Sequence, residues 1–487
     1  MAGTRKDISK LNGPWSDEML WYARAVRALQ GRAPADRTSW WYLAAIHGID
    51  IPGWVQQGIV PSAGSLPPQG EQDLIFNQCQ HAGWFFLPWH RGYLAAFEAI
   101  LDAWISAQPG GPQDWALPYW NYLSDSNSNG RAIPQEFLDP TLPDGSANPL
   151  SQVRRNGMQV LGPQPWFPGD ISLSAQTRSL PFTAAPGTEG YGGAISGFAQ
   201  QGSLTGAVEG DPHNRVHVMV GGVQPVAGWM SDPDYAALDP IFWMHHCNID
   251  RFWAAWMSDP ANQQEASGAW SNGPFPRQFL MPNPAGGGDV FLPGQTLPGG
   301  PLAPVYDSLH DGTGIAQAVA GGPVTEGAMI TSGGAGGSAL LGSNTAPLRV
   351  AATPATTEIA IPASAATEFA AVPGLGPEPR LYLNLEGVRG AAAAGVLQVH
   401  LRLPGEGGGL RLADTVALFG LGKASSTEGV HAGNGLSLAI DITDLAREIQ
   451  MTAPGALERL SVELSQPGAP ETEITVERVS LYRQEMG

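Results

Sequence analysis

The spacing of apolar residues changes once along this 487-residue chain, and that change limits the folds open to it. In the first part, apolar residues recur every three or four positions, which is typical of helices that bury one face. The clearest of these segments cover residues 16–29, 37–48, 87–105 and 239–257. In the last part the spacing is two, which indicates half-buried antiparallel strands. The chain is therefore predicted to contain a helical domain followed by a β-domain.

The boundary between these domains is marked by composition. All sixteen Trp residues lie before residue 271, and residues 321–346 are rich in Gly, Ala and Ser, which is typical of a linker. We therefore predict a mainly α domain over residues 1–320, a linker over 321–346 and a small antiparallel β-sandwich over 347–487. The strands are expected at residues 380–388, 396–403, 436–443, 459–465 and 473–483.

The charge balance excludes several classes of partner. The chain carries 25 Lys and Arg against 44 Asp and Glu, a net charge of -19, and has no basic run. Nucleic acid and anionic membranes are therefore not expected as partners. No stretch reaches about 18 uninterrupted apolar residues, and the N-terminus lacks a signal-peptide core. We expect a cytoplasmic protein, and its two cysteines give no disulfide framework.

Two histidine motifs predict one set of metal ligands. In "DPHNRVH", His213 and His217 are four residues apart, so on a helix their rings lie on one face, within about 40° of each other. In "DPIFWMHHCNIDRFW", His245 and His246 are adjacent, and one of them adds a third imidazole. The residues alone leave open which one. Both motifs begin with Asp-Pro, which predicts an Asp N-cap and Pro at the first helical position.

A second set is predicted upstream, in "CQHAGWFFLPWHRGYLAAFE". His81 and His90 are nine residues apart, which would place them on opposite sides of an unbroken helix. Pro88 predicts instead that a helix begins at or just after it, so that both rings can face one point. His47 ends "WWYLAAIHG" beside a Gly48 C-cap and is the candidate third ring.

Six imidazoles without an evident bridging carboxylate point to a particular class of metal. Dinuclear hydrolytic sites generally recruit Asp or Glu, because hard cations prefer oxygen ligands. An all-imidazole set suits copper, zinc or nickel, and copper binds most tightly among these divalent ions. A pair of copper ions implies chemistry with O2.

These motifs strongly resemble the two copper signatures of the tyrosinase, polyphenol oxidase and molluscan haemocyanin superfamily, over about residues 40 to 260. The resemblance implies a four-helix bundle that holds two copper ions. In the family, the second histidine of the adjacent pair is the ligand, and we expect Phe242 to pack on its ring. The implied ligands are His47, His81 and His90 for the first copper and His213, His217 and His246 for the second. His245 is then expected in the substrate pocket.

The resemblance also implies roles for residues around the ligands. Cys79 lies two residues before His81, the spacing that forms a thioether bond between sulfur and imidazole in fungal tyrosinases and molluscan haemocyanins. Glu209 and Asn214 match residues proposed to order a water that removes the phenol proton. Val218 is expected at the pocket entrance. The alternatives are a free buried thiol for Cys79 and a loop carboxylate near a helix N-terminus for Glu209.

The implied activity is the oxidation of small phenols by O2, with ortho-hydroxylation of monophenols and conversion of o-diphenols to o-quinones. The β-domain resembles the C-terminal domain of plant polyphenol oxidases, which implies an enzyme that is latent until this domain is displaced. The alternatives are a catechol oxidase without monophenolase activity, an o-aminophenol oxidase, a zinc hydrolase and, in another class, a haemocyanin-like oxygen carrier. A copper-delivery helper protein and the oligomeric state stay open.

The remaining charged and histidine residues are expected outside the chemistry. Asp250 and Arg251 predict a buried ion pair or helix anchor, and Arg5 resembles an N-terminal arginine that pins the ends of the domain. Cys247 is interpreted as a packing residue. The other three histidines are expected to be bystanders; they are His310, His400 and His431.

Overall fold

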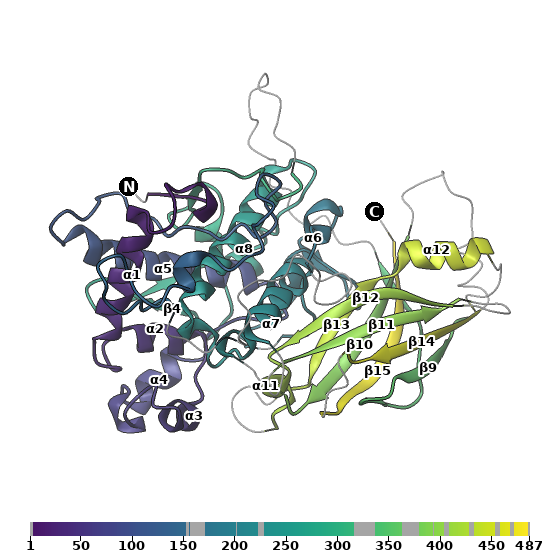
Figure 1. The fold of residues 1–487 in the computed structure, drawn as a ribbon. Helices are drawn as coiled ribbons and strands as arrows, with labels where there is room; N and C mark the ends of the chain where they lie inside the picture. Colours follow the sequence, from purple (N-terminus) through teal and green to yellow (C-terminus); the bar gives the residue numbers. More distant parts are fainter. Residues whose placement is uncertain are drawn as a thin grey trace, which may run out of the picture.

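In the computed structural model, a helical domain and a β-domain pack side by side, with α7 (Arg215–Gly221) next to β12 (Leu410–Phe419) (Figure 1). No helix in the described part of the chain is long and apolar enough to cross a membrane. The structure describes residues 3–151, 155, 171–200, 202–222, 228–315, 337–362, 379–392, 394–403, 409–427, 433–452, 458–467 and 472–485.

Four helices predicted from the sequence form the centre of the first domain. They are α1 (Asp17–Gln30), α2 (Trp40–His47), α5 (Phe86–Ser106) and α8 (Pro240–Ser258). The side chains of Ser16, Ser39 and Asp239 cap α1, α2 and α8 by accepting hydrogen bonds from backbone N–H groups in the first turn. Fully buried Trp side chains fill much of the space between these helices, which explains why Trp is confined to this domain.

Shorter elements complete the helical domain. The helices are α3 (Ile51–Gln56), α4 (Gln69–Ile75), α6 (Ser174–Thr177) and α9 (Gly268–Ser271), and a π-helical segment η4 (Glu209–Asn214) leads into α7. Three small strand pairs join loops: β1 (Thr4–Arg5) with β6 (Val305–Tyr306), β2 (Thr183–Ala184) with β3 (Gly193–Ala194), and β4 (Phe279–Pro282) with β5 (Gly288–Phe291).

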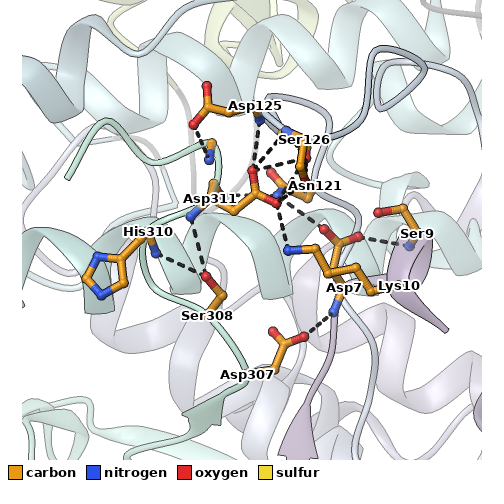
Figure 2. Close-up of polar contacts among 12 residues, drawn as sticks. Asp7, Ser9, Lys10, Asn121, Asp125, Ser126, Asp307, Ser308, His310 and Asp311 are labelled. Carbon is orange, nitrogen blue, oxygen red and sulfur yellow. Dashed lines mark hydrogen bonds and ion pairs between the residues drawn. The ribbon is translucent and has the colours of Figure 1, made fainter. Parts of the chain in front are cut away.

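The carboxylate of Asp311 ties the N-terminal segment to the end of the domain. Figure 2 shows that it accepts hydrogen bonds from Lys10 Nζ (2.7 Å), Ser126 Oγ (2.7 Å) and the Asp125 backbone N–H (2.8 Å). Together these contacts lower the pKa of the Asp311 carboxyl. Three segments that are distant in sequence are thereby held together beside the β1–β6 pair.

The second domain is the predicted antiparallel β-sandwich. One sheet has the order β13-β10-β15-β7, with β8 also paired to β15, and the other has the order β12-β11-β14-β9. Its helices are α11 (Leu421–Ser425) and α12 (Thr443–Thr452). The strands, besides β12, are β7 (Ser338–Ser343), β8 (Leu348–Val350), β9 (Ala355–Ala360), β10 (Arg380–Gly390), β11 (Ala394–Arg402), β13 (Leu436–Asp441), β14 (Arg459–Ser465) and β15 (Ile474–Gln484).

The structure differs from the predicted boundaries of this domain in two ways. Residues 338–343, assigned to the linker from their composition, form β7 and pair with β15. The rest of the predicted linker, up to residue 336, lies outside the described residues. Four strands were not predicted, β7, β8, β9 and β12. β12 was missed because its alternation of apolar and polar residues is interrupted. Its pairing with β11 shifts register opposite Val399 and His400 of β11.

Candidate metal centre

The first histidine cluster is assembled from three segments of the helical domain. His47 is the last residue of α2, His81 lies in the segment between α4 and α5, and His90 lies near the start of α5. α5 begins at Phe86, two residues before Pro88, which therefore sits in the first turn, where it removes no helical hydrogen bond. The structure brings the three predicted imidazoles together, with candidate ligand atoms within 4.8 Å of one another.

Hydrogen bonds to backbone carbonyls fix the tautomers in this cluster. Nδ1 of His47 lies 2.8 Å from the Pro233 carbonyl oxygen, and Nδ1 of His90 lies 2.7 Å from the Phe86 carbonyl oxygen. Because a carbonyl only accepts, each Nδ1 must carry the hydrogen. Nε2 then keeps its lone pair, and that of His47 is buried without a hydrogen-bond partner among the described residues. Such a nitrogen is a free metal ligand.

The second cluster comes from η4, α7 and α8. His217 donates from Nδ1 to the Met230 carbonyl oxygen (2.7 Å), so the lone pair stays on its Nε2, which faces Nε2 of His246. His213 instead lies with Nδ1 2.9 Å from Oδ1 of its neighbour Asn214, and its Nε2 has no partner among the described residues. The structure brings His213 and His217 together with both residues of the adjacent pair on α8, with candidate ligand atoms within 4.8 Å of one another.

The N-cap predicted at Asp211 is confirmed for the backbone, which is extended at the kink before Pro212, but not for the side chain. Asp211 has an extended backbone (φ -143°, ψ 115°) inside η4, and its carboxylate accepts hydrogen bonds from the backbone N–H and hydroxyl of Ser172. It also lies 3.7 Å from the Arg215 guanidinium. The corresponding prediction for Asp239 is confirmed, since its carboxylate accepts from the Ile241 N–H at 3.1 Å. The same dipeptide therefore begins the two segments differently, because a partner outside the helix engages the first aspartate.

The two clusters adjoin in the buried centre of the domain. The rings of His90 and His246 stack with centroids 4.4 Å apart, and the centroids of His81 and His213 are 5.9 Å apart. Burial lowers the pKa of all six predicted ligands, to about 3 for His90 and His217, and neighbouring imidazoles add to the shift at every one except His217. All six are therefore neutral near pH 7, the form that binds a metal. Neutral imidazoles, four of which have Nδ1 held by an oxygen acceptor, fit two copper ions.

Both histidines of the adjacent pair reach the second cluster. His246 Nε2 lies 3.3 Å from His217 Nε2, and its ring packs on Phe242 with centroids 4.1 Å apart, as expected. The His245 ring stacks on His213 (5.4 Å), and both of its nitrogens are buried without a partner among the described residues. Its ring also lies 5.7 Å from that of Tyr122. The assignment of His246 as ligand and His245 as a pocket residue stays a prediction.

Cys79 lies against the imidazole of His81. Its Sγ is 3.5 Å from both Nδ1 and Nε2 of that ring, so it is equidistant from the two ring nitrogens. It is also 3.4 Å from Nε2 of His90. Burial raises the pKa of the Cys79 thiol. Cys247 is a buried free cysteine on α8.

Glu209 and Asn214 both lie in η4 but contact different groups. The Glu209 carboxylate accepts from the Ala82 backbone N–H with both oxygens (2.8 and 3.0 Å), next to His81. Burial raises the pKa of Glu209 to about 8. The side-chain oxygen of Asn214 is used by His213. Glu209 is thus a buried carboxyl in the shell around the first cluster, and not a loop carboxylate.

Phe419 is a site residue that the sequence did not predict. It ends β12 in the β-domain, yet its ring stacks on His217 with centroids 4.1 Å apart. The centroids of His81 and His213 lie 5.7 and 5.8 Å away, so Phe419 covers both clusters. Val218, predicted at the entrance, is fully buried on α7. The local signal beside Phe419 is Gly420, which turns the chain with φ 72° directly after β12.

The residues expected outside the chemistry are held in structural contacts. The Asp250 carboxylate binds Arg91 (2.5 Å) and Arg5 (3.1 Å), and all three side chains are buried. Arg251 instead donates to backbone carbonyls and to Asn248 and Asn121. His310 and His400 lie outside both clusters, whereas His431 lies outside the described residues.

Comparison with known proteins agrees with this geometry. Residues 37–259 match the family described as "Common central domain of tyrosinase". Residues 337–484 match DUF7868, a domain of unknown function. The fold resembles that of latent apple tyrosinase, with a TM-score of 0.62 at 18% identity, covering 100% of this chain and 98% of that one.

Relatives of similar sequence include a polyphenol oxidase and a tyrosinase. The latent chloroplastic polyphenol oxidase of Prunus armeniaca is 30% identical over 44% of this chain and 36% of its own length. Tyrosinase HcTyr1 of Hahella sp. (strain CCB-MM4) is 32% identical over 99% of both chains. With two adjoining imidazole clusters in its central domain, the chain belongs to the tyrosinase family of copper-dependent phenol oxidases.

Proposed function

We propose that the chain hydroxylates monophenols at the ortho position and oxidises o-diphenols to o-quinones, and that its β-domain keeps this activity latent. The observation that carries the proposal is the pair of buried, neutral imidazole clusters, both covered by one aromatic ring from the second domain. The copper ligands would be His47, His81 and His90 in the first cluster and His213, His217 and His246 in the second. Bound there, a copper pair would supply the electron exchange with O2.

The protein's own part is to hold the rings and exclude water. Phe86 and Phe242 pack on imidazoles of the two clusters, with centroids 4.6 Å from His90 and 4.1 Å from His246. The carbonyls of Pro233 and Met230 fix the orientation of two further ligands. These contacts preorganise the site, so little reorganisation is needed when the metal binds.

Glu209 is proposed to order, together with Asn214, a water that accepts the phenol proton. An unperturbed phenol has a pKa near 10, so hydroxylation near neutrality needs a base. Burial raises the pKa of Glu209 to about 8, and the positive charge of a bound copper pair would favour the ionised form. Asn214, in the same segment η4 as Glu209, accepts a hydrogen bond from Nδ1 of His213. This pair supports a tyrosinase over a pure catechol oxidase.

Phe419 supports latency. Its ring occupies the space over His217 that an aromatic substrate would need, and it is delivered by β12 of the β-domain. Interdomain ion pairs hold the β-domain in place, including Arg215 with Asp414 at 2.6 Å and Arg178 with Asp441 at 3.6 Å. A phenol could approach only after this ring moves.

Activity on four substrates tests the reaction. The copper-loaded chain is assayed with tyramine, tyrosine, catechol and 3-amino-4-hydroxybenzoate, before and after proteolysis between the domains. We expect turnover of monophenol and diphenol, with a lag phase on the monophenol. Oxidation of catechol alone would identify a catechol oxidase, preference for the aminophenol an o-aminophenol oxidase, and reversible O2 binding without oxidation an oxygen carrier.

A single substitution tests latency in the intact chain. Phe419→Ala removes the covering ring, and we expect turnover of a bulky catechol to rise by about tenfold or more. Phe275→Ala, which truncates an exposed Phe outside both clusters, is the matched control. Equal turnover in Phe419→Ala and the unmodified chain contradicts shielding by this residue.

The contact between Cys79 and His81 supports a thioether bond. Forming a bond from Sγ to a ring carbon removes one hydrogen from each residue, and copper with O2 would accept the two electrons. Peptide mass spectrometry of the copper-loaded chain should show a cross-linked peptide that has lost two hydrogen atoms. Cys79→Ser removes the cross-link, and two unlinked residues in the copper-loaded chain contradict the proposal.

A further inference from the structure

A second residue of the β-domain reaches the helical domain just beyond Phe419. Lys423 lies on α11, the short helix that follows Gly420, and is one of three lysines in the chain. Its ammonium forms an ion pair with the Asp234 carboxylate and lies 3.4 Å from Oδ1 of Asn77. Both acidic and basic side chains of the pair are largely buried, at 17% and 14% exposure. The contact is therefore part of the packed domain boundary.

Asp234 lies next to the carbonyl that orients a copper ligand. The preceding residue, Pro233, accepts the hydrogen bond from Nδ1 of His47 at 2.8 Å. This backbone approaches α2 so closely that a Cβ on Gly48 would lie 2.5 Å from the Pro233 oxygen and 2.8 Å from Oδ1 of Asp234. A glycine is thus required after His47 for the carbonyl to reach the ring. A shift of the backbone at Pro233 and Asp234 would therefore disturb the hydrogen bond between the Pro233 carbonyl and Nδ1 of His47.

Asn77 connects the same lysine to the end of α2. Its side-chain oxygen accepts from the Ile49 N–H at 3.1 Å, and its own N–H donates to the Ala45 carbonyl oxygen at 3.1 Å. These two contacts flank His47 on both sides. Asn77 also begins the segment that leads to Cys79 and His81. Lys423 therefore contacts the two segments that support the first cluster, and it comes from the other domain.

We propose that Lys423 is a positioning residue for the first copper: by anchoring Asp234 and Asn77 it keeps the Pro233 carbonyl on His47, so that docking of the β-domain strengthens copper binding there. This inference rests on the proposed copper ligands. Two neighbouring residues of the β-domain would then have different effects on the site. Phe419 closes the site to substrate, whereas Lys423, four residues later, supports a metal ligand.

Equilibrium copper binding tests the proposal without relying on turnover. Full-length Lys423→Met is compared with the unmodified chain in chelator buffers that fix the free copper concentration, and bound copper is measured by metal analysis. Loss of a contact that orients a metal ligand typically lowers affinity by about 10- to 100-fold. We expect this loss for one copper equivalent per chain, with the other equivalent unchanged. Lys423→Arg should retain most of the affinity.

Two further variants show which copper site is weakened in Lys423→Met and whether loss of the lysine contact is the reason. The electron paramagnetic resonance spectrum of half-loaded Lys423→Met should match that of His47→Ala, in which only the second cluster is intact. Arg380→Met is the control, because it removes a contact across the same boundary, to the Ser179 carbonyl at 3.3 Å, away from the first cluster. We expect no change in either copper equivalent for this control.

Gly48→Ala displaces the Pro233 carbonyl from inside the helical domain and should weaken the same copper equivalent. If X-ray scattering shows that the domains have separated in Lys423→Met, copper binding by Gly48→Ala is used as the test instead. Unchanged binding of both equivalents in Gly48→Ala, or in a docked Lys423→Met, overturns the inference. An unmodified chain that binds fewer than two coppers would instead contradict the proposed function.

Discussion

The two histidine clusters are built in different ways. In the second cluster, His213 and His217 share one short stretch of helix and His246 comes from the long helix α8. In the first, three separate segments each supply one ring, and the orientation of His47 depends on a carbonyl 186 residues away. Local spacing therefore brings two rings of the second cluster together, whereas the first cluster depends on contacts between separate segments, two of which also contact Lys423 of the other domain.

Removing one ligand from each cluster gives the largest expected effect. His47→Ala and His217→Ala should each leave one copper per chain and lower phenol oxidation by about a thousandfold or more, because both metals are needed to react with one O2 molecule. Metal analysis and catechol turnover check this. His310→Ala, outside both clusters, is the control. Retention of two coppers in either variant would remove that histidine from the ligand set.

The second largest expected effect concerns the buried ion pairs between α5 and α8, the long helices that carry ligands of the two clusters. Asp250 on α8 binds Arg91 on α5, and Asp250→Asn should lower the free energy of unfolding by about 3–5 kcal/mol, since it leaves buried guanidinium groups short of negative charge. Urea unfolding measures the change. The control is Asp444→Asn, which breaks an exposed pair with Arg447 and should have little effect. A small effect at Asp250 would mean that the helices are held by apolar packing alone.

The pH dependence of the copper-free chain tests the burial of Glu209. Its pKa of about 8 in the folded protein exceeds the ordinary value of 4.5, so ionisation favours the unfolded state as pH rises between these values. Glu209→Gln removes this penalty and should stabilise the copper-free chain by about 3 kcal/mol at pH 7 and by little at pH 4. Urea unfolding at both pH values checks it, with the exposed Glu358→Gln as control. Equal stability of Glu209→Gln and the unmodified chain at pH 7 contradicts the raised pKa.

The smallest effect concerns the helix that ends at His47. Ser39 Oγ accepts from the Tyr42 N–H at 3.1 Å and caps α2, so Ser39→Ala should cost about 1 kcal/mol of stability. Thermal unfolding measures it. Ser62→Ala, whose side chain caps no helix, is the control. If the cap matters for the first cluster in particular, Ser39→Ala also weakens copper binding there, and an unchanged affinity would limit its role to stability.

The same contrast explains what the sequence could predict. The four main helices, the second cluster and five strands follow from spacings of three, four or two residues, which are local properties. Phe419 and Lys423 could not be placed, because their roles depend on how one domain docks on the other. Capping by the Asp211 side chain was predicted wrongly for a related reason: Ser172 engages its carboxylate, and no local pattern indicates that contact. Local patterns thus predicted the main helices, five strands and the histidine motifs, but not the contacts between distant segments.

Copper content measured together with oxidation of one monophenol and one diphenol tests the central claim most directly. The account predicts two copper ions per chain, oxidation of both substrates, and loss of one copper when any of the six histidines is replaced. Fewer than two copper ions in the fully loaded protein, or full activity without them, would contradict it.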